Sequence, residues 1–245
     1  SNPVKDNWKT IIAEGKFPLS ISSCGRKLFA SYIEDAVSKV YQVDLNGKRE
    51  KEIILPGLGT AGGFGGKMDE KETYYTYTSY VYPPTIFKYN IKTGKSEVYK
   101  VSGVKFDPSL YESKQVFYDA EDGERIPMII TYKKGMQLNG KNPVLLYGYG
   151  GFSVSLTPSF SVSNLVFMEN GGVYAVANLR GGGEYGEGDV WTFGHLVGAG
   201  AGTWQAAHRV KAPVRLAGEG FGFALSAGYD AGGAGSGAGA GAGGA

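Results

Sequence analysis

Up to about residue 104, short runs rich in β-branched and aromatic residues alternate with polar turns. Such runs are typical of β-strands. Strands are predicted at residues 27–34, 39–45, 72–82, 85–91 and 96–101. Turn signals such as Thr93-Gly94 and Pro83-Pro84 separate them. The first part of the chain is therefore expected to consist of β-hairpins.

An internal repeat is present within these strands. Residues 40–48 resemble residues 86–91 and the turn at residues 93–95, at an offset of about 46 residues, within the ~40–50 residues of a β-propeller blade. A blade is a four-stranded sheet whose faces are buried by neighbouring blades. We therefore predict the terminal blades of a β-propeller at residues 1–104, and the alternative is two similar hairpins in another type of β protein.

The pattern changes after Asp107-Pro108-Ser109, a loop signal that we interpret as a domain junction. Strands are predicted at residues 114–118, 125–132, 143–147 and 173–179. A helix is expected to start at Thr157-Pro158 and to end at Asn170-Gly171-Gly172. Strand, helix and strand with short links predict a right-handed parallel unit. The expected divisions are a mixed α/β domain at residues 105–230 and a Gly/Ala tail, or unassigned residues, at 231–245.

Composition narrows the possible partners. The net charge of only +2 does not favour nucleic acid or an anionic membrane, and no apolar run is long enough to span a bilayer. Cys24 is the single cysteine, and the sequence has no Cys/His cluster for a metal. We expect a soluble monomer without cofactor or metal, located in the cytoplasm or, alternatively, in the periplasm. The chain starts at Ser1 with neither an initiator Met nor a signal peptide, which mature processing or a fragment would each explain. We expect a fragment, because two blades do not close a propeller.

A first candidate for chemistry is the segment Tyr147-Gly148-Tyr149-Gly150-Gly151-Phe152, which follows a buried strand. In open α/β sheets, ligands collect at the carboxyl ends of strands. Glycines allow the backbone to approach a substrate closely, and a Tyr hydroxyl fixed ~3 Å from a developing oxyanion can donate to it. The alternative is a glycine-rich strand exit with core aromatics.

A second strand exit runs from Asn178 to Gly186 and contains three consecutive glycines. Arg180 and Glu184 can pair across this glycine turn. A buried pair of that kind more often fixes a loop than takes part in chemistry, so a structural role is predicted. The literal G-x-G-x-x-G match at residues 57–62 precedes more glycines, not a helix, and is not expected to bind a dinucleotide.

Together these stretches resemble the prolyl oligopeptidase family. The resemblance runs through residues 111–118, 122–123, 126–130, 133–135, 140–143, 146–152, 159–162 and 171–186, and less strongly through residues 8–104. It implies an α/β-hydrolase domain capped by a seven-bladed propeller, and a serine peptidase that hydrolyses short peptides on the carboxyl side of proline. Tyr149 matches the family's oxyanion-hole tyrosine, and Phe152 matches an aromatic residue lining the proline pocket. Oligopeptidase B, which cuts after basic residues, is a poorer match.

The family's nucleophile is not visible in the chain. Gly220 occupies the Ser position of the Gly-x-Ser-x-Gly turn, and Ser226 lacks the first glycine of that turn. His195 and His208 precede it, whereas the triad order is Ser, Asp, His, and Asp230 is the only later acid. One explanation is a catalytically inactive peptide-binding fragment or pseudoenzyme. The other is that Gly and Ala after about residue 187 stand where side chains were not identified.

Peptide mass mapping of the last third of the natural protein separates these explanations. Because the family motifs give way abruptly to Gly and Ala, we expect peptides of mixed composition and a Ser at the turn near Gly220. Recovery of peptides that consist of Gly/Ala runs would contradict this expectation.

Overall fold

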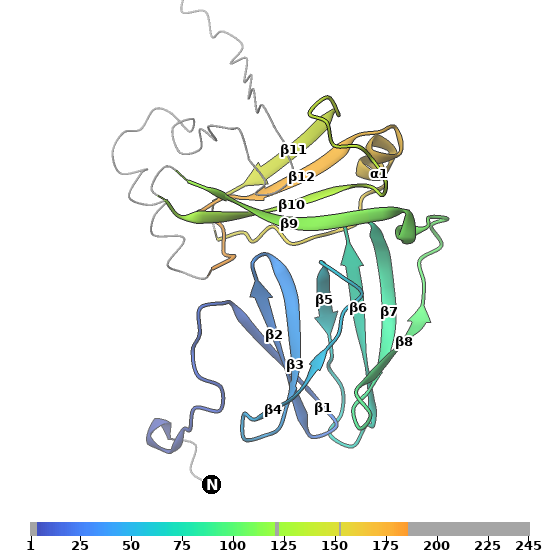
Figure 1. Ribbon diagram of the computed structural model, residues 1–245. Coiled ribbons are helices and arrows are strands. Elements are labelled where there is room, and N and C mark those ends of the chain that lie inside the picture. Colours follow the sequence, from blue (N-terminus) through green and yellow to red (C-terminus); the bar gives the residue numbers. More distant parts are fainter. Residues whose placement is uncertain (1–3, 121–122, 152, 186–245) are drawn as a thin grey trace, which may run out of the picture.

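The computed structural model describes residues 4–120, 123–151 and 153–185. Two four-stranded antiparallel sheets form its first part (Figure 1). The first sheet contains β1 (Leu19–Cys24), β2 (Lys27–Glu34), β3 (Val37–Val43) and β4 (Arg49–Ile53). The second contains β5 (Thr60–Gly63), β6 (Glu72–Ser79), β7 (Tyr82–Asn90) and β8 (Lys95–Lys100), and the short 3-10 turn η1 (Lys5–Asn7) precedes both. Each strand pairs with the next one in sequence, which is the arrangement of a propeller blade.

The sequence repeat corresponds to a structural repeat. The repeated segments are β3 and β7, the third strands of the two blades. Asp44 and Asn90 end the equivalent strands, and each side-chain oxygen accepts hydrogen bonds from backbone N–H groups of the following turn at 2.8–2.9 Å. Gly47 and Gly94 then take positive φ values of 88° and 75°, which glycine adopts without a Cβ penalty. Both blades therefore turn by the same device.

An aromatic interior joins the two blades. The ring of Phe64 stacks on Phe29 at 5.4 Å and on Tyr75 at 4.6 Å between centroids, and Tyr75 stacks on Phe87 at 5.2 Å. All four side chains are buried. Such contacts add to the large apolar area that aromatic side chains bury. The Tyr-rich strand β6 therefore serves mainly for packing between blades, although Tyr74 on its other face is exposed.

A third, mixed sheet lies across the ends of both blades (Figure 1). It contains β9 (Tyr111–Asp119), β10 (Arg125–Lys133), β11 (Val144–Tyr149) and β12 (Val173–Asn178), in the spatial order β11-β12-β10-β9. The 3-10 turn η2 (Pro108–Leu110) precedes β9, and the helix α1 (Val162–Glu169) connects β11 to β12. The predicted parallel pairing of β11 with β12 is confirmed, but β11, which was predicted to be buried, is partly exposed because within the described residues no strand pairs with its other edge. β10 and β12 are buried along nearly their whole length, as expected of central strands.

The predicted start of the helix is wrong by four residues. Ser161 is the N-cap residue and the helix begins at Val162, whereas Pro158 lies in the connection before it. There the Pro158 carbonyl accepts a hydrogen bond from the Thr60 hydroxyl at 2.7 Å, so a contact with the second blade keeps this segment out of the helix. The predicted end is confirmed, because Asn170 caps the helix and the next residue has φ of +84°.

The blades contact the third sheet through hairpin tips and an apolar cluster. Tyr80, from the β6–β7 turn, meets Tyr174 of β12 edge-on at 5.3 Å. Asp35, at the tip of the β2–β3 hairpin, accepts a hydrogen bond from the Tyr185 hydroxyl at 2.7 Å, and its backbone carbonyl accepts one from the Gln115 amide. The third sheet is therefore fastened to both blades. Within the described residues, no helix has the length and apolar character needed to cross a membrane.

Candidate functional site

The two glycine-rich strand exits lie at one edge of the third sheet. β11 and β12 are parallel and in register, with Tyr149 opposite Asn178 at their carboxyl ends. Gly150-Gly151 follows β11, and residues 181–183 follow β12. Because parallel strands that pair in register end together, the two segments singled out from the sequence are brought side by side at the edge where α/β sheets bind ligands.

The two exits also interlock through their glycines. A Cβ atom at Gly150 would lie 2.6 Å from the Cβ of Leu179, on the other exit. In the opposite direction, a Cβ at Gly183 would lie 2.7 Å from the backbone oxygen of Ser153. Neither distance leaves room for a side chain, so the glycines at these positions permit close backbone packing. The edge is therefore built from two mutually dependent loops.

Tyr149 stands at this edge with 37% of its surface exposed. Its hydroxyl has no hydrogen-bond partner within the described residues, and a phenolic hydroxyl is a donor as well as an acceptor. The preceding strand residues fix its backbone through the ladder with β12. The structure thus places an accessible tyrosine at the carboxyl end of β11.

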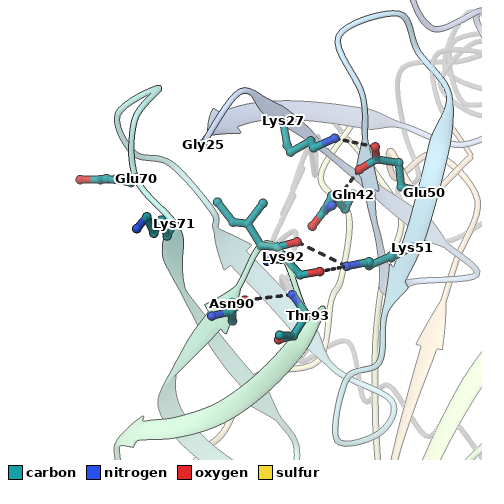
Figure 2. Close-up of a pocket in the computed structure, with 11 residues that line it drawn as sticks. Gly25, Lys27, Gln42, Glu50, Lys51, Glu70, Lys71, Asn90, Lys92 and Thr93 are labelled. Atoms are coloured by element: carbon teal, nitrogen blue, oxygen red, sulfur yellow. Dashed lines mark hydrogen bonds and ion pairs between the residues drawn. The ribbon is translucent and has the colours of Figure 1, made fainter.

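A cleft of about 730 Å³ lies between the two blades, at the ends remote from the third sheet (Figure 2). It is lined by Gly25, Lys27, Gln42, Glu50, Lys51, Glu70, Lys71, Asn90, Ile91, Lys92 and Thr93. It is not apparent from the sequence, because its residues come from five separate stretches of the chain. Its size would suit a small molecule.

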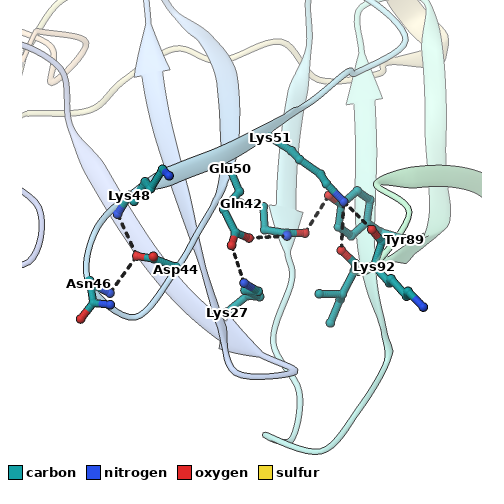
Figure 3. A network of polar contacts seen from close by, with 10 residues as sticks. Lys27, Gln42, Asp44, Asn46, Lys48, Glu50, Lys51, Tyr89 and Lys92 are labelled. Carbon is teal, nitrogen blue, oxygen red and sulfur yellow. Dashed lines mark hydrogen bonds and ion pairs between the residues drawn. The ribbon is translucent and has the colours of Figure 1, made fainter.

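The polar groups of this cleft satisfy one another (Figure 3). The Tyr89 hydroxyl donates to Gln42 Oε1 at 2.9 Å, and Gln42 Nε2 donates to Glu50 Oε2 at 2.8 Å. Lys27 Nζ contacts the other Glu50 oxygen at 2.5 Å. Hydrogen bonds from Lys27 and then Gln42 lower the pKa of Glu50, and burial raises the pKa of Tyr89 to about 12. Glu50 is therefore a charged acceptor with both oxygens engaged.

Lys51 closes the cleft on its other side. Its ammonium group crosses from the first blade and donates to the backbone oxygen of Lys92 at 2.6 Å, at the end of β7 (Figure 3). The Lys92 side chain points away from this network (Figure 3). Hydrogen bonds between matched donors and acceptors thus join the two blades across this cleft. Among the described residues, no group of three or more His, Cys, Asp or Glu side chains could hold a metal ion.

A family model and several known proteins are similar in sequence to this chain. Residues 1–102 match the family model described as the N-terminal β-propeller domain of prolyl oligopeptidase. A prolyl endopeptidase of Elizabethkingia meningoseptica is 56% identical over 186 residues, which cover 76% of this chain and 26% of the relative. A prolyl endopeptidase of Dictyostelium discoideum is 36% identical over 189 residues, covering 75% and 25%. The chain belongs to the prolyl oligopeptidase family.

Solved structures of this family agree. A prolyl endopeptidase structure, from a study of inter-domain dynamics in catalysis and specificity, superposes with a TM-score of 0.70 at 41% identity, over 80% of this chain and 28% of that one. Prolyl oligopeptidase B from Galerina marginata, bound to a 25mer macrocyclization substrate, gives 0.67 at 28% identity, over 77% and 26%. The chain spans about a quarter of the length of these relatives. The predicted propeller portion is confirmed.

The predicted Arg180–Glu184 pair is replaced by other contacts of Glu184. Glu184 is 1% exposed, and its Oε1 accepts hydrogen bonds from the Leu156 N–H at 2.8 Å and from Asn178 Nδ2 at 3.1 Å. The expectation that Glu184 fixes a loop agrees with these contacts, but the partners are different. Leu156 carries no sequence signal for this role, because its contribution comes from its backbone.

The remaining sequence candidates of this family member lie outside the described residues. They are Phe152, His195, His208, Gly220, Ser226, Asp230 and the tail at residues 231–245. The candidate site that the structure describes therefore consists of the strand-exit edge around Tyr149.

The contacts of Glu50 predict a pH effect on stability. A carboxyl whose pKa is lowered on folding stabilises the folded state above its unfolded pKa of about 4.3, and this stabilisation is lost as pH falls through the folded pKa. We expect Glu50→Gln to reduce the loss of unfolding free energy between pH 6 and pH 3, measured by urea denaturation. Glu14→Gln, at an exposed position, is the control. An unchanged pH dependence in Glu50→Gln would contradict the prediction.

Proposed function

We propose that this chain supplies part of a serine-type endopeptidase that hydrolyses short peptides on the carboxyl side of proline through an acyl-enzyme. The observation that carries the proposal is the Tyr149 hydroxyl, accessible and without a described partner, at the carboxyl end of β11. The names of the relatives, prolyl endopeptidases of two Elizabethkingia species and of Dictyostelium, support this substrate class.

The proposed domain organisation assigns residues 1–104 to terminal propeller blades, 105–230 to part of an α/β-hydrolase domain, and 231–245 to a tail or unassigned residues. The mixed sheet supports the second assignment. Its parallel pair β11–β12 is connected through α1, and its central strands are buried, as in sheets covered on both faces. The blades pack against this sheet at Tyr80, whose ring contacts Tyr174 of β12.

The proposed role of Tyr149 is to donate a hydrogen bond to the oxyanion that forms when the scissile carbonyl is attacked. Such a donor acts mainly in the transition state, where negative charge has developed on the carbonyl oxygen. The absence of a side chain at Gly150 lets the chain after Tyr149 pack closely against Leu179 of the other strand exit. Phe152 is proposed to line the pocket for the proline ring, and the nucleophile, acid and base are not assigned.

One sequence observation favours a second candidate function. Gly220 stands where the family's nucleophilic Ser is expected, and a glycine cannot attack a carbonyl. The second candidate is therefore a catalytically inactive protein that binds proline-containing peptides without cutting them.

Two measurements on the intact natural protein separate these functions. A peptidase is expected to release fluorophore from a peptide with proline before the scissile bond, and to be labelled covalently by a serine-reactive phosphonate. A protein pre-treated with the phosphonate should lose the turnover. Absence of both turnover and labelling would contradict the peptidase proposal and favour the binding protein.

Removing the Tyr149 hydroxyl should slow the chemical step. We expect Tyr149→Phe to lower kcat by about 10²–10³-fold with little change in KM, because the lost hydrogen bond forms in the transition state. Tyr147→Phe is the matched control, since Tyr147 lies on the same strand but before the edge, and its kcat should remain within about twofold of the wild-type value. An equal fall in both variants, or a change confined to KM, would argue against the oxyanion role.

A further inference from the structure

Two buried side chains hold both backbone groups of Leu156. The Leu156 N–H donates to Glu184 Oε1 at 2.8 Å, and the Leu156 carbonyl accepts from Asn178 Nδ2 at 2.7 Å. Asn178 Nδ2 also donates to Glu184 Oε1 at 3.1 Å. Glu184 and Asn178 are 1% and 3% exposed. We call these three contacts the Leu156 clamp.

The clamp is directly connected to the candidate site. Asn178 is the residue opposite Tyr149 in the β11–β12 ladder. The ladder fixes the backbone of Tyr149, and the side chain of Asn178, as part of the clamp, binds the Leu156 carbonyl. Asn178 thus links the clamp to the strand end that carries Tyr149. A donor on a backbone fixed in this way can be held in position before the substrate arrives.

The clamp also leaves buried polar atoms without partners. Glu184 Oε2 and Asn178 Oδ1 have no hydrogen bond within the described part of the chain. An unpaired buried polar atom is unfavourable for folding, and native proteins carry few of them. Stability alone therefore does not favour a carboxylate at position 184. A geometric requirement of the neighbouring site is a reason to retain it.

We propose that Glu184 is a positioning residue for the peptidase site: through the Leu156 clamp it holds the segment after β11 and, with it, the Tyr149 donor. The proposal rests on the proposed peptidase function. It assigns to Glu184 no contact with the substrate and no proton transfer.

The test is a double-mutant cycle in the intact natural protein. Glu184→Met keeps the length of the side chain and removes the acceptor, and we expect kcat to fall by about 10–100-fold with KM nearly unchanged. Glu184→Gln keeps Oε1 as an acceptor and should stay within about threefold of wild type. If Glu184 acts through Tyr149, Glu184→Met should have little further effect in the Tyr149→Phe background. Full additivity of the two substitutions would overturn the proposal.

A control variant separates positioning from stability. Val176→Ala truncates a buried residue of β12, the strand that carries Asn178, and Val176 takes no part in the clamp. It should lower Tm but leave kcat unchanged well below Tm. If Val176→Ala lowers kcat as much as Glu184→Met at equal loss of stability, Glu184 is merely structural and the proposal fails.

Hydrogen exchange at the Leu156 amide tests the clamp independently of activity. Its protection should fall at least about tenfold in Glu184→Met and persist in Glu184→Gln. Wild-type protein that shows the clamp but no turnover would refute the proposed peptidase function and leave Glu184 as the residue that holds this segment. Unchanged protection in Glu184→Met would overturn the clamp itself, whatever the activity.

Discussion

The parallel, in-register pairing of β11 with β12 is the constraint on which the candidate site depends. It places Tyr149 opposite Asn178 and ends both strands at one edge. A shift by one residue would turn every side chain of β11 to the other face of the sheet. It would also separate Gly150 from Leu179, whose close approach leaves no room for a Cβ. The register of two short apolar strands therefore determines the position of Tyr149.

Local signals in the sequence were sufficient to predict most of the strands and the end of the helix. The 46-residue repeat correctly identified the third strands of two blades, because the same side-chain oxygen and glycine make both turns. The parallel pair and the end of α1 followed from buried apolar runs and from Asn170-Gly171. β1, β4 and β5 were missed, because their sequences, LSISSC, REKEI and TAGG, are rich in polar, charged or glycine residues. Pairing with neighbouring strands stabilises these three strands, and the strand propensity of their own residues does not predict them.

The site was predictable only in part, for a related reason. Tyr149 is identified by glycines that follow a short apolar run, which is a local pattern. The partner of Glu184 is not local: the backbone of Leu156 lies 28 residues away in sequence and presents no side-chain signal. Arg180 was the nearest opposite charge, and charge alone suggested the wrong partner. Side-chain to backbone contacts of this kind are visible only in the folded chain.

The second strand exit connects the site to the propeller through consecutive residues. Glu184 binds the segment that follows β11, whereas the hydroxyl of its neighbour Tyr185 donates to Asp35 at the tip of the first blade. Lys16, from the segment before β1, lies over the Tyr185 ring at 4.9 Å. A displacement of the first blade must break these contacts or carry residues 184–185 with it. Because Glu184 holds Leu156, a movement of residues 184–185 would disturb the Leu156 clamp beside Tyr149. The position of the blade and the geometry of the site are thus linked through two adjacent side chains.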